Sequence, residues 1–133
     1  MAKTVVVKRR MDLDWQKLCE MASSEVEAVL RDLPKELCER VRKLPITFEH
    51  RPGEELRADG IDEDTLGVFT GTEYAEEGHF PMPAQIILFL ENILDQAEGD
   101  GNVFRDEIRT TFLHELGHFL GLDEEDLTER GLE

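Results

Sequence analysis

The sequence predicts a single domain that combines helices with a few short strands. Three patterns predict this mixture: an apolar stripe with helical spacing before residue 34, three short strand-like segments in the middle, and a second helical pattern beyond residue 100. A chain of 133 residues has the length of one domain and can bury a core without disulfide bridges. We therefore expect residues 1–133 to fold as one unit.

A long helix is predicted near the N-terminus, starting at Asp12 or Asp14 as a cap and running to about Asp32. Its apolar side chains recur at the i, i+3, i+4 spacing of one buried face, at Trp15, Leu18, Cys19, Ala22, Val26, Val29, Leu30 and Leu33. Before it, residues 4–8 favour an extended conformation, so we expect residues 1–11 to be either flexible or an extra strand.

A second, shorter helix and three strands are predicted to follow. Pro34 suits the first turn of a helix that continues to about residue 43. Residues 46–50 and 66–70 have the composition and alternation of strands, with an acidic loop at 51–64 between them. Residues 85–90 form a continuous apolar run, which is typical of a strand covered on both faces.

The C-terminal third is predicted to be mainly helical. After an exposed connection at 71–84 and a short helical turn at 91–96, capping residues at 98–102 precede a helix over 103–120. That helix is apolar on nearly all sides, so it should lie at the centre of the domain. Residues 124–131 can form one more short helix.

The composition excludes several classes of partner. The chain has 31 acidic and 15 basic residues, a net charge of −16, and four of its basic residues lie in the first ten positions. Such a negative field repels phosphate backbones, so we expect no nucleic-acid partner; it serves solubility first and can also favour cationic peptides. No apolar run approaches the roughly 20 residues of a membrane span, so we expect no membrane partner.

The two cysteines, Cys19 and Cys38, indicate a compartment. Two thiols in an otherwise cysteine-free chain are expected to be reduced and buried, which favours a reducing environment. Residues 5–7 are too short an apolar segment for a secretory signal. We therefore expect a cytoplasmic protein.

The most specific chemistry lies in the motif H-E-x-x-H, from His114 to His118. Residues four apart share one face of a helix, so both imidazoles can bind one Zn²⁺, with bonds of roughly 2.0–2.1 Å. Glu115 lies next to the first ligand and can act as general base towards a water molecule, then as general acid. As ordinary residues of a buried helix, these three polar groups would need partners without water, which favours zinc ligation.

A third zinc ligand is predicted in the acidic segment that follows. Gly121 can take a positive φ, end the helix and reverse the chain. Glu124 comes six residues after His118 and is the predicted third ligand, with Asp123 as the alternative. The acidic run at 123–126 can also be a solvated face or the acidic first turn of a helix.

The segment H-E-x-x-H-x-x-G-x-x-E resembles the metzincin motif, with a carboxylate in place of its third histidine. The chain also resembles the small bacterial zincin-like metallopeptidases, the minimal zincins, over about residues 12–131 and most specifically in its C-terminal third. The matching features are the helix from Trp15 to Pro34, the strand after Leu44–Pro45, and the segments 66–69, 85–89, 105–118 and 119–127. Three positions depart from the family: Phe119 where a second histidine is frequent, Glu124 where aspartate is common, and no methionine after Leu120 to form a Met-turn.

This resemblance implies an α+β fold, in which a small mixed sheet packs against a central metal-binding helix, with helices at the N-terminus. It also implies a zinc metallopeptidase, which hydrolyses a peptide or protein substrate with a metal-activated water. We expect the substrate to add as a strand at the edge of the sheet, with residues 85–90 as the candidate edge.

Two other functions stay open. One is a non-catalytic metal-binding or interaction module of the same fold. The other is a metal-dependent ribonuclease, against which Glu115 and the net charge of −16 both argue. No pattern in the sequence indicates an oligomeric state.

Overall fold

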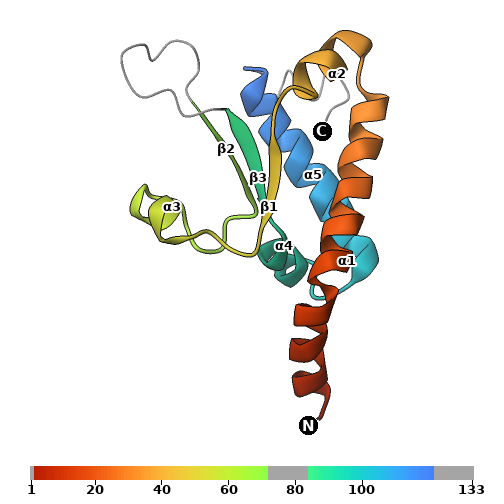
Figure 1. Cartoon of the computed structure of the whole chain (residues 1–133), viewed down its shortest axis with the longest axis vertical. Helices are drawn as coiled ribbons and strands as arrows, with labels where there is room; N and C mark the ends of the chain where they lie inside the picture. Colours follow the sequence, from red (N-terminus) through yellow and green to blue (C-terminus); the bar gives the residue numbers. More distant parts are fainter. Residues whose placement is uncertain (1, 72–83, 122–133) are drawn as a thin grey trace.

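The computed structural model describes residues 2–71 and 84–121, with side chains from Trp15 onward. Over these residues the protein has the predicted α+β architecture, in which a small sheet packs against long helices (Figure 1). The elements in chain order are α1 (Ala2–Asp32), α2 (Lys35–Val41), β1 (Ile46–Glu49), α3 (Glu54–Ala58), β2 (Gly67–Thr70), β3 (Gln85–Phe89), α4 (Leu90–Gln96) and α5 (Gly101–Phe119).

The described strands form a mixed sheet in the order β1-β3-β2. β1 runs parallel to β3, with Phe48 opposite Leu88, and β2 runs antiparallel to β3, with Gly67 opposite the same leucine. β3 is buried from Ile86 to Phe89, as its continuous apolar run predicted. The prediction that residues 85–90 form an edge is wrong, because β3 has a hydrogen-bonded neighbour on each side.

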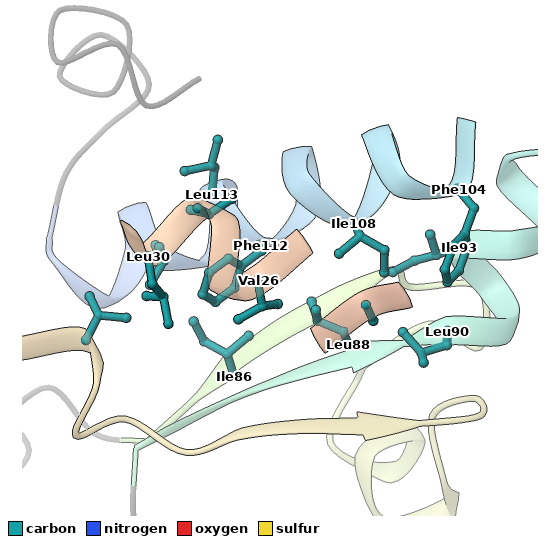
Figure 2. Close-up of a cluster of buried hydrophobic side chains, with 14 of the residues drawn as sticks. Val26, Leu30, Ile86, Leu88, Leu90, Ile93, Phe104, Ile108, Phe112 and Leu113 are labelled. Carbon is teal, nitrogen blue, oxygen red and sulfur yellow. The ribbon is translucent and has the colours of Figure 1, made fainter. Parts of the chain in front are cut away.

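The core lies between the sheet and the two long helices. Figure 2 shows Val26 and Leu30 of α1 gathered with Phe112 of α5 and Ile86 of β3. The cluster continues along α5 and α4 through Ile108, Phe104, Ile93 and Leu90. Because α1, α4 and two strands all pack against it, α5 is the central element that its apolar composition predicted.

Both ends of α5 have the predicted caps. At its start, the Asp100 carboxylate accepts hydrogen bonds from the main-chain N–H groups of Asn102 and Val103, at 2.8 and 3.1 Å. Such a cap is worth about 1 kcal/mol. At its end, Gly121 has φ +72°, a value that glycine adopts without steric cost. These two features therefore fix where α5 begins and where it ends.

The N-terminal prediction is wrong, because α1 begins at Ala2 and includes residues 4–8. Extending an existing helix needs no new nucleus, and the helix propensity of valine lies within about 0.7 kcal/mol of that of alanine. Local preference for an extended conformation was therefore too small to prevent helix formation. None of the described helices is both long and apolar enough to cross a membrane.

Other boundaries differ by smaller amounts. Pro34 precedes α2 as its N-cap instead of lying in its first turn. α3 lies within the predicted loop 51–64, and it has no buried residue, so no apolar periodicity could have predicted it. The predicted helix at 124–131 and nearly all of the connection at 71–84 lie outside the described residues.

Cys19 and Cys38 are both free thiols, as expected. Each is half-buried rather than fully buried, because each lies beside the core cluster instead of within it. Burial raises the pKa of the Cys19 thiol, which keeps it in the protonated, less reactive form.

A polar network anchors the chain between β1 and β2 to α4. Asn92 is 4% exposed, and its Nδ2 donates to the carbonyls of Glu63 and Thr65, at 2.7 and 2.9 Å. Arg51 donates to the Asn92 Oδ1 and also forms an ion pair with Asp95. Since residues 63 and 65 lead directly into β2, this network fixes the place where that strand begins.

Gly67 lets β2 approach α5 closely. A Cβ added at this position would lie 2.7 Å from Cγ2 of Thr111 and 3.1 Å from Cδ2 of Leu88. The first distance is below any normal contact, so the two elements can pack this closely only with glycine in β2. The distance between β2 and the C-terminal half of α5 thus depends on this glycine.

We expect Gly67→Ala to lower the free energy of unfolding by about 1–3 kcal/mol, because the added methyl overpacks the contact with Thr111. Thr111→Ser removes the opposing methyl group, so Gly67→Ala should lower the free energy of unfolding by less in that background. A double-mutant cycle by denaturant unfolding measures this coupling.

Gly101→Ala is the matched control, because a Cβ at the start of α5 meets its nearest atom, in Met21, at an ordinary 3.7 Å. It should leave stability unchanged or raise it, since alanine favours a helix over glycine. A Gly67→Ala variant as stable as the wild type would show that β2 can move away from α5 at no cost.

Candidate metal site

The C-terminal half of α5 brings the two predicted histidine ligands together. His114 and His118 lie one turn apart, and their Nε2 atoms are 3.2 Å from each other. The ring centroids are 4.7 Å apart, with the planes at 85°. Both side chains are exposed, so the paired nitrogens are accessible from solvent.

The separation of the two nitrogens fits a shared zinc ion. Two nitrogens at roughly 2.0–2.1 Å from a tetrahedral Zn²⁺ lie about 3.3 Å from each other. The observed Nε2–Nε2 distance of 3.2 Å matches this value. Among the residues that the structure describes, His114, Glu115 and His118 are the one group of three potential ligands close enough to hold a metal ion.

Glu115 lies beside this pair but in a different environment. It is 9% exposed, and one of its carboxylate oxygens lies within 4.8 Å of the ligand nitrogens of both histidines. The sequence predicted that all three polar groups would lie on a buried helix, and this holds for Glu115 alone. His114 and His118 lie on the part of α5 that no described element covers.

The Glu115 carboxylate has a partner on the sheet. Its Oε1 accepts a hydrogen bond of 3.0 Å from the main-chain N–H of Phe69, in β2. Burial raises the pKa of Glu115, and the charges of His118 and His114 together with this hydrogen bond act in the opposite direction. A carboxylate with a raised pKa is a stronger base, as proton abstraction from water requires.

A pocket of about 430 Å³ opens between the end of β2 and the end of α5. Its lining consists of Val68, Phe69, Gly71, Glu115 and His118. Volumes of this size are ordinary for small-ligand sites. Glu115 and one of the two paired histidines, His118, therefore line a common space.

Phe69, one of the residues that line this pocket, also contacts a second aromatic ring. The ring of Phe69 packs edge-on against Phe119, with centroids 5.7 Å apart. Phe119 follows His118 directly, so the contact joins β2 to the last turn of α5. Minimal zincins often have a second histidine at the position of Phe119, and in this protein the residue packs against Phe69.

The predicted third ligand, Glu124, and its alternative, Asp123, lie outside the described residues. The positive φ of Gly121 ends α5 three residues after His118, as the motif predicted. Sequence reasoning missed Phe69. Its contribution is a main-chain N–H, a group present in nearly every residue, so no side-chain pattern could have identified it.

In a comparison with protein families, residues 41–132 match the zincin-like metallopeptidase family. This segment contains the whole sheet and α5 with both histidines, whereas α1 precedes it. The resemblance of residues 12–40 to the same family therefore stays a prediction. A comparison with curated proteins finds no match. Because the matched segment covers well over half of the sequence, the chain belongs to the zincin-like metallopeptidase family.

Proposed function

We propose that this protein is a zinc-dependent peptidase. The observation that carries the proposal is the 3.2 Å separation of the His114 and His118 Nε2 atoms, with the Glu115 carboxylate buried beside them. Membership of the zincin-like metallopeptidase family supports a protease. The arrangement places two metal ligands and a base on one helical turn, as the HExxH motif of a metallopeptidase requires.

His114 and His118 would hold the zinc, with Glu124 as the third ligand and Asp123 as the alternative. Zinc, when bound, supplies Lewis acidity, which lowers the pKa of a water that it holds to about 7. Neutral imidazole is the form that binds metal, and the exposure of both rings lets an ion reach them from solvent. The acidic segment at 123–126 would add negative charge to the same end of α5.

Glu115 would accept a proton from the attacking water and return it to the leaving amine. Its Oε1 is bonded to Phe69, so the second oxygen is the one that would receive the proton. Burial raises the pKa of Glu115, which makes its carboxylate a stronger base towards the attacking water. Glu115 is therefore the catalytic residue in this proposal, and the histidines are its metal ligands.

The substrate would bind as an extended peptide along β2, and not along β3. Phe89 N–H donates to the Leu66 carbonyl at 2.9 Å, so the main chain of Leu66 faces β3. Main-chain groups alternate in direction along an antiparallel strand, so those of Gly67 and Phe69 face away from β3. The outward N–H of Phe69 is bonded to Glu115, and the remaining outward groups, among them the Phe69 carbonyl, form the edge to which a peptide can add, beside the pocket lined by Glu115.

The composition supports a cytoplasmic peptidase over a nuclease. Free thiols at Cys19 and Cys38 are those of a protein in a reducing compartment. A net charge of −16 opposes the binding of nucleic acid and tolerates or attracts cationic peptides. A peptide or protein is thus the proposed substrate.

We expect His114→Ala and His118→Ala each to abolish stoichiometric zinc binding, because each removes one of the two paired nitrogens. Both side chains are exposed, so neither change should lower the melting temperature of the metal-free protein appreciably. Elemental analysis of the purified variants measures the zinc. His50→Ala, at another exposed histidine, should keep its zinc, and normal zinc in either ligand variant would refute the site.

Glu124→Ala should weaken zinc binding more than Asp123→Ala does, because Glu124 stands six residues after His118. Isothermal titration of both variants with Zn²⁺ compares them directly. A larger loss in Asp123→Ala would move the third ligand by one position.

Glu115→Gln should keep zinc and lose hydrolysis by about 10²–10⁴-fold, because an amide cannot accept the proton. Its carbonyl oxygen can still accept the Phe69 hydrogen bond, so the fold should stay intact. Zinc content and cleavage of a mixed peptide library, measured in parallel with the wild type, provide the test. Full zinc with an unchanged cleavage rate would exclude Glu115 as the base.

The pKa of Glu115 supplies a folding control. Its raised value means that the folded protein resists ionisation of this group, so above the ordinary glutamate pKa the carboxylate lowers stability. Metal-free Glu115→Gln lacks this cost and should be at least as stable as the wild type at neutral pH.

Wild-type protein that binds zinc and cleaves no peptide would favour the non-catalytic module, and cleavage of RNA would favour the ribonuclease.

A further inference from the structure

We propose that the main-chain N–H of Phe69 positions the Glu115 carboxylate for proton transfer. Strand β2 would then be part of the catalytic apparatus as well as the surface that receives the peptide. This inference rests on the proposed function, because it assigns a positioning group to the base of that reaction. Three observations support it: the hydrogen bond between Phe69 and Glu115, the place of β2 in the strand order, and the alignment of α5 along β2.

The contact is a single anchor on a buried charge. Phe69 N–H donates to Glu115 Oε1 at 3.0 Å, and among the described residues this is the hydrogen bond that the carboxylate makes. A glutamate side chain has three rotatable bonds, so without an anchor its oxygens would sample several positions. Hydrogen bonds to charged groups are among the stronger ones in proteins, and a side chain that is 9% exposed has little water to replace them.

The strand order makes this N–H available. In a central strand such as β3, successive N–H groups are all used by the two neighbouring strands. β2 has β3 on one side only among the described strands, so every second N–H along it faces away from the sheet. Phe69 is at such an outward position, and its N–H is bonded to Glu115 instead of to another strand.

The register of α5 along β2 brings the two groups together. Four residues of a helix and two residues of a strand both advance by about 6–7 Å. Accordingly, Thr111 faces Gly67 and Glu115 faces Phe69, one step further along each element. The glycine that permits the close approach therefore also sets the distance over which Phe69 can reach the carboxylate.

The two carboxylate oxygens thereby acquire separate tasks. Oε1 is held by β2, and the second oxygen stays available for the proton. Loss of the anchor should lower the rate of the chemical step, because the base is misplaced. It should leave zinc binding and peptide affinity nearly unchanged, because neither the histidines nor the outward carbonyl of Phe69 is altered.

The test compares Phe69→Pro with Phe69→Ala. Both variants lose the phenyl ring and its contact with Phe119, and the proline variant alone loses the N–H. That N–H is not used between β2 and β3, so proline is acceptable at this edge position. We expect kcat of the proline variant to be about 10- to 100-fold below that of the alanine variant, with similar KM and equal zinc content.

Two results separate this inference from the proposed function. Wild-type protein without peptide hydrolysis would overturn the proposed function, and the positioning role with it. Active wild type with equal kcat in the proline and alanine variants would overturn the positioning role alone. A proline variant with the alanine kcat and a raised KM would also overturn it, because the N–H would then serve substrate binding.

A second measurement needs neither turnover nor the proline variant. Amide hydrogen exchange of metal-free protein should show Phe69 N–H protected in the wild type and in Glu115→Gln, which keeps an acceptor oxygen. In Glu115→Ala the same amide should exchange at least about tenfold faster, since an outward N–H on an edge strand then meets water. The Val68 amide, which faces β3, is the internal reference and should not change. Equal Phe69 exchange in the wild type and Glu115→Ala would overturn the inference.

Discussion

The close packing of α5 against β2 is the constraint on which the rest of the site depends. A residue without a side chain, Gly67, lies against Thr111, and this contact lets the helix and the strand run side by side at matched steps. α1, α4 and β3 also pack against α5, so the helix cannot turn freely to relieve a misfit with β2. The position of Glu115 relative to Phe69 follows from this packing and not from the local geometry of α5.

The site divides into an open half and a closed half. His114 and His118 are exposed, so an ion can reach their nitrogens from solvent, and water can reach the same side of the helix. Glu115 is buried, and burial raises the pKa of its carboxyl group, which favours proton uptake. A base in water would be weaker, and ligands in the core would be harder for a metal to reach. One helical turn therefore presents two environments, because the sheet covers one side of it only.

Strong periodic patterns predicted most of the fold. The apolar stripe of α1 and the continuous apolar run of β3 buried the faces expected of them, and α5 is central as its composition predicted, although one of its faces, with His114 and His118, is exposed. The failures occurred where the local signal is weak. The valines at 5–7 lie within α1 despite their preference for strands, and α3 has no buried residue from which an apolar pattern could predict it. The prediction of an edge at β3 is wrong because the residues of a strand do not indicate how many neighbouring strands pair with it.

The sequence by itself determined the spacing of His114 and His118, the carboxylate of Glu115 beside them and the glycine that follows α5. These are properties of one helix and the residue that follows it. Residues four apart on a helix lie on the same face whatever the rest of the chain does. Only the tertiary structure decided that β2, and not β3, lies beside Glu115, and that a main-chain N–H of Phe69 holds the carboxylate. Phe69 and Glu115 are more than forty positions apart in the sequence. Their contact depends on the strand order and on how the face of α5 packs along β2, which no local pattern specifies.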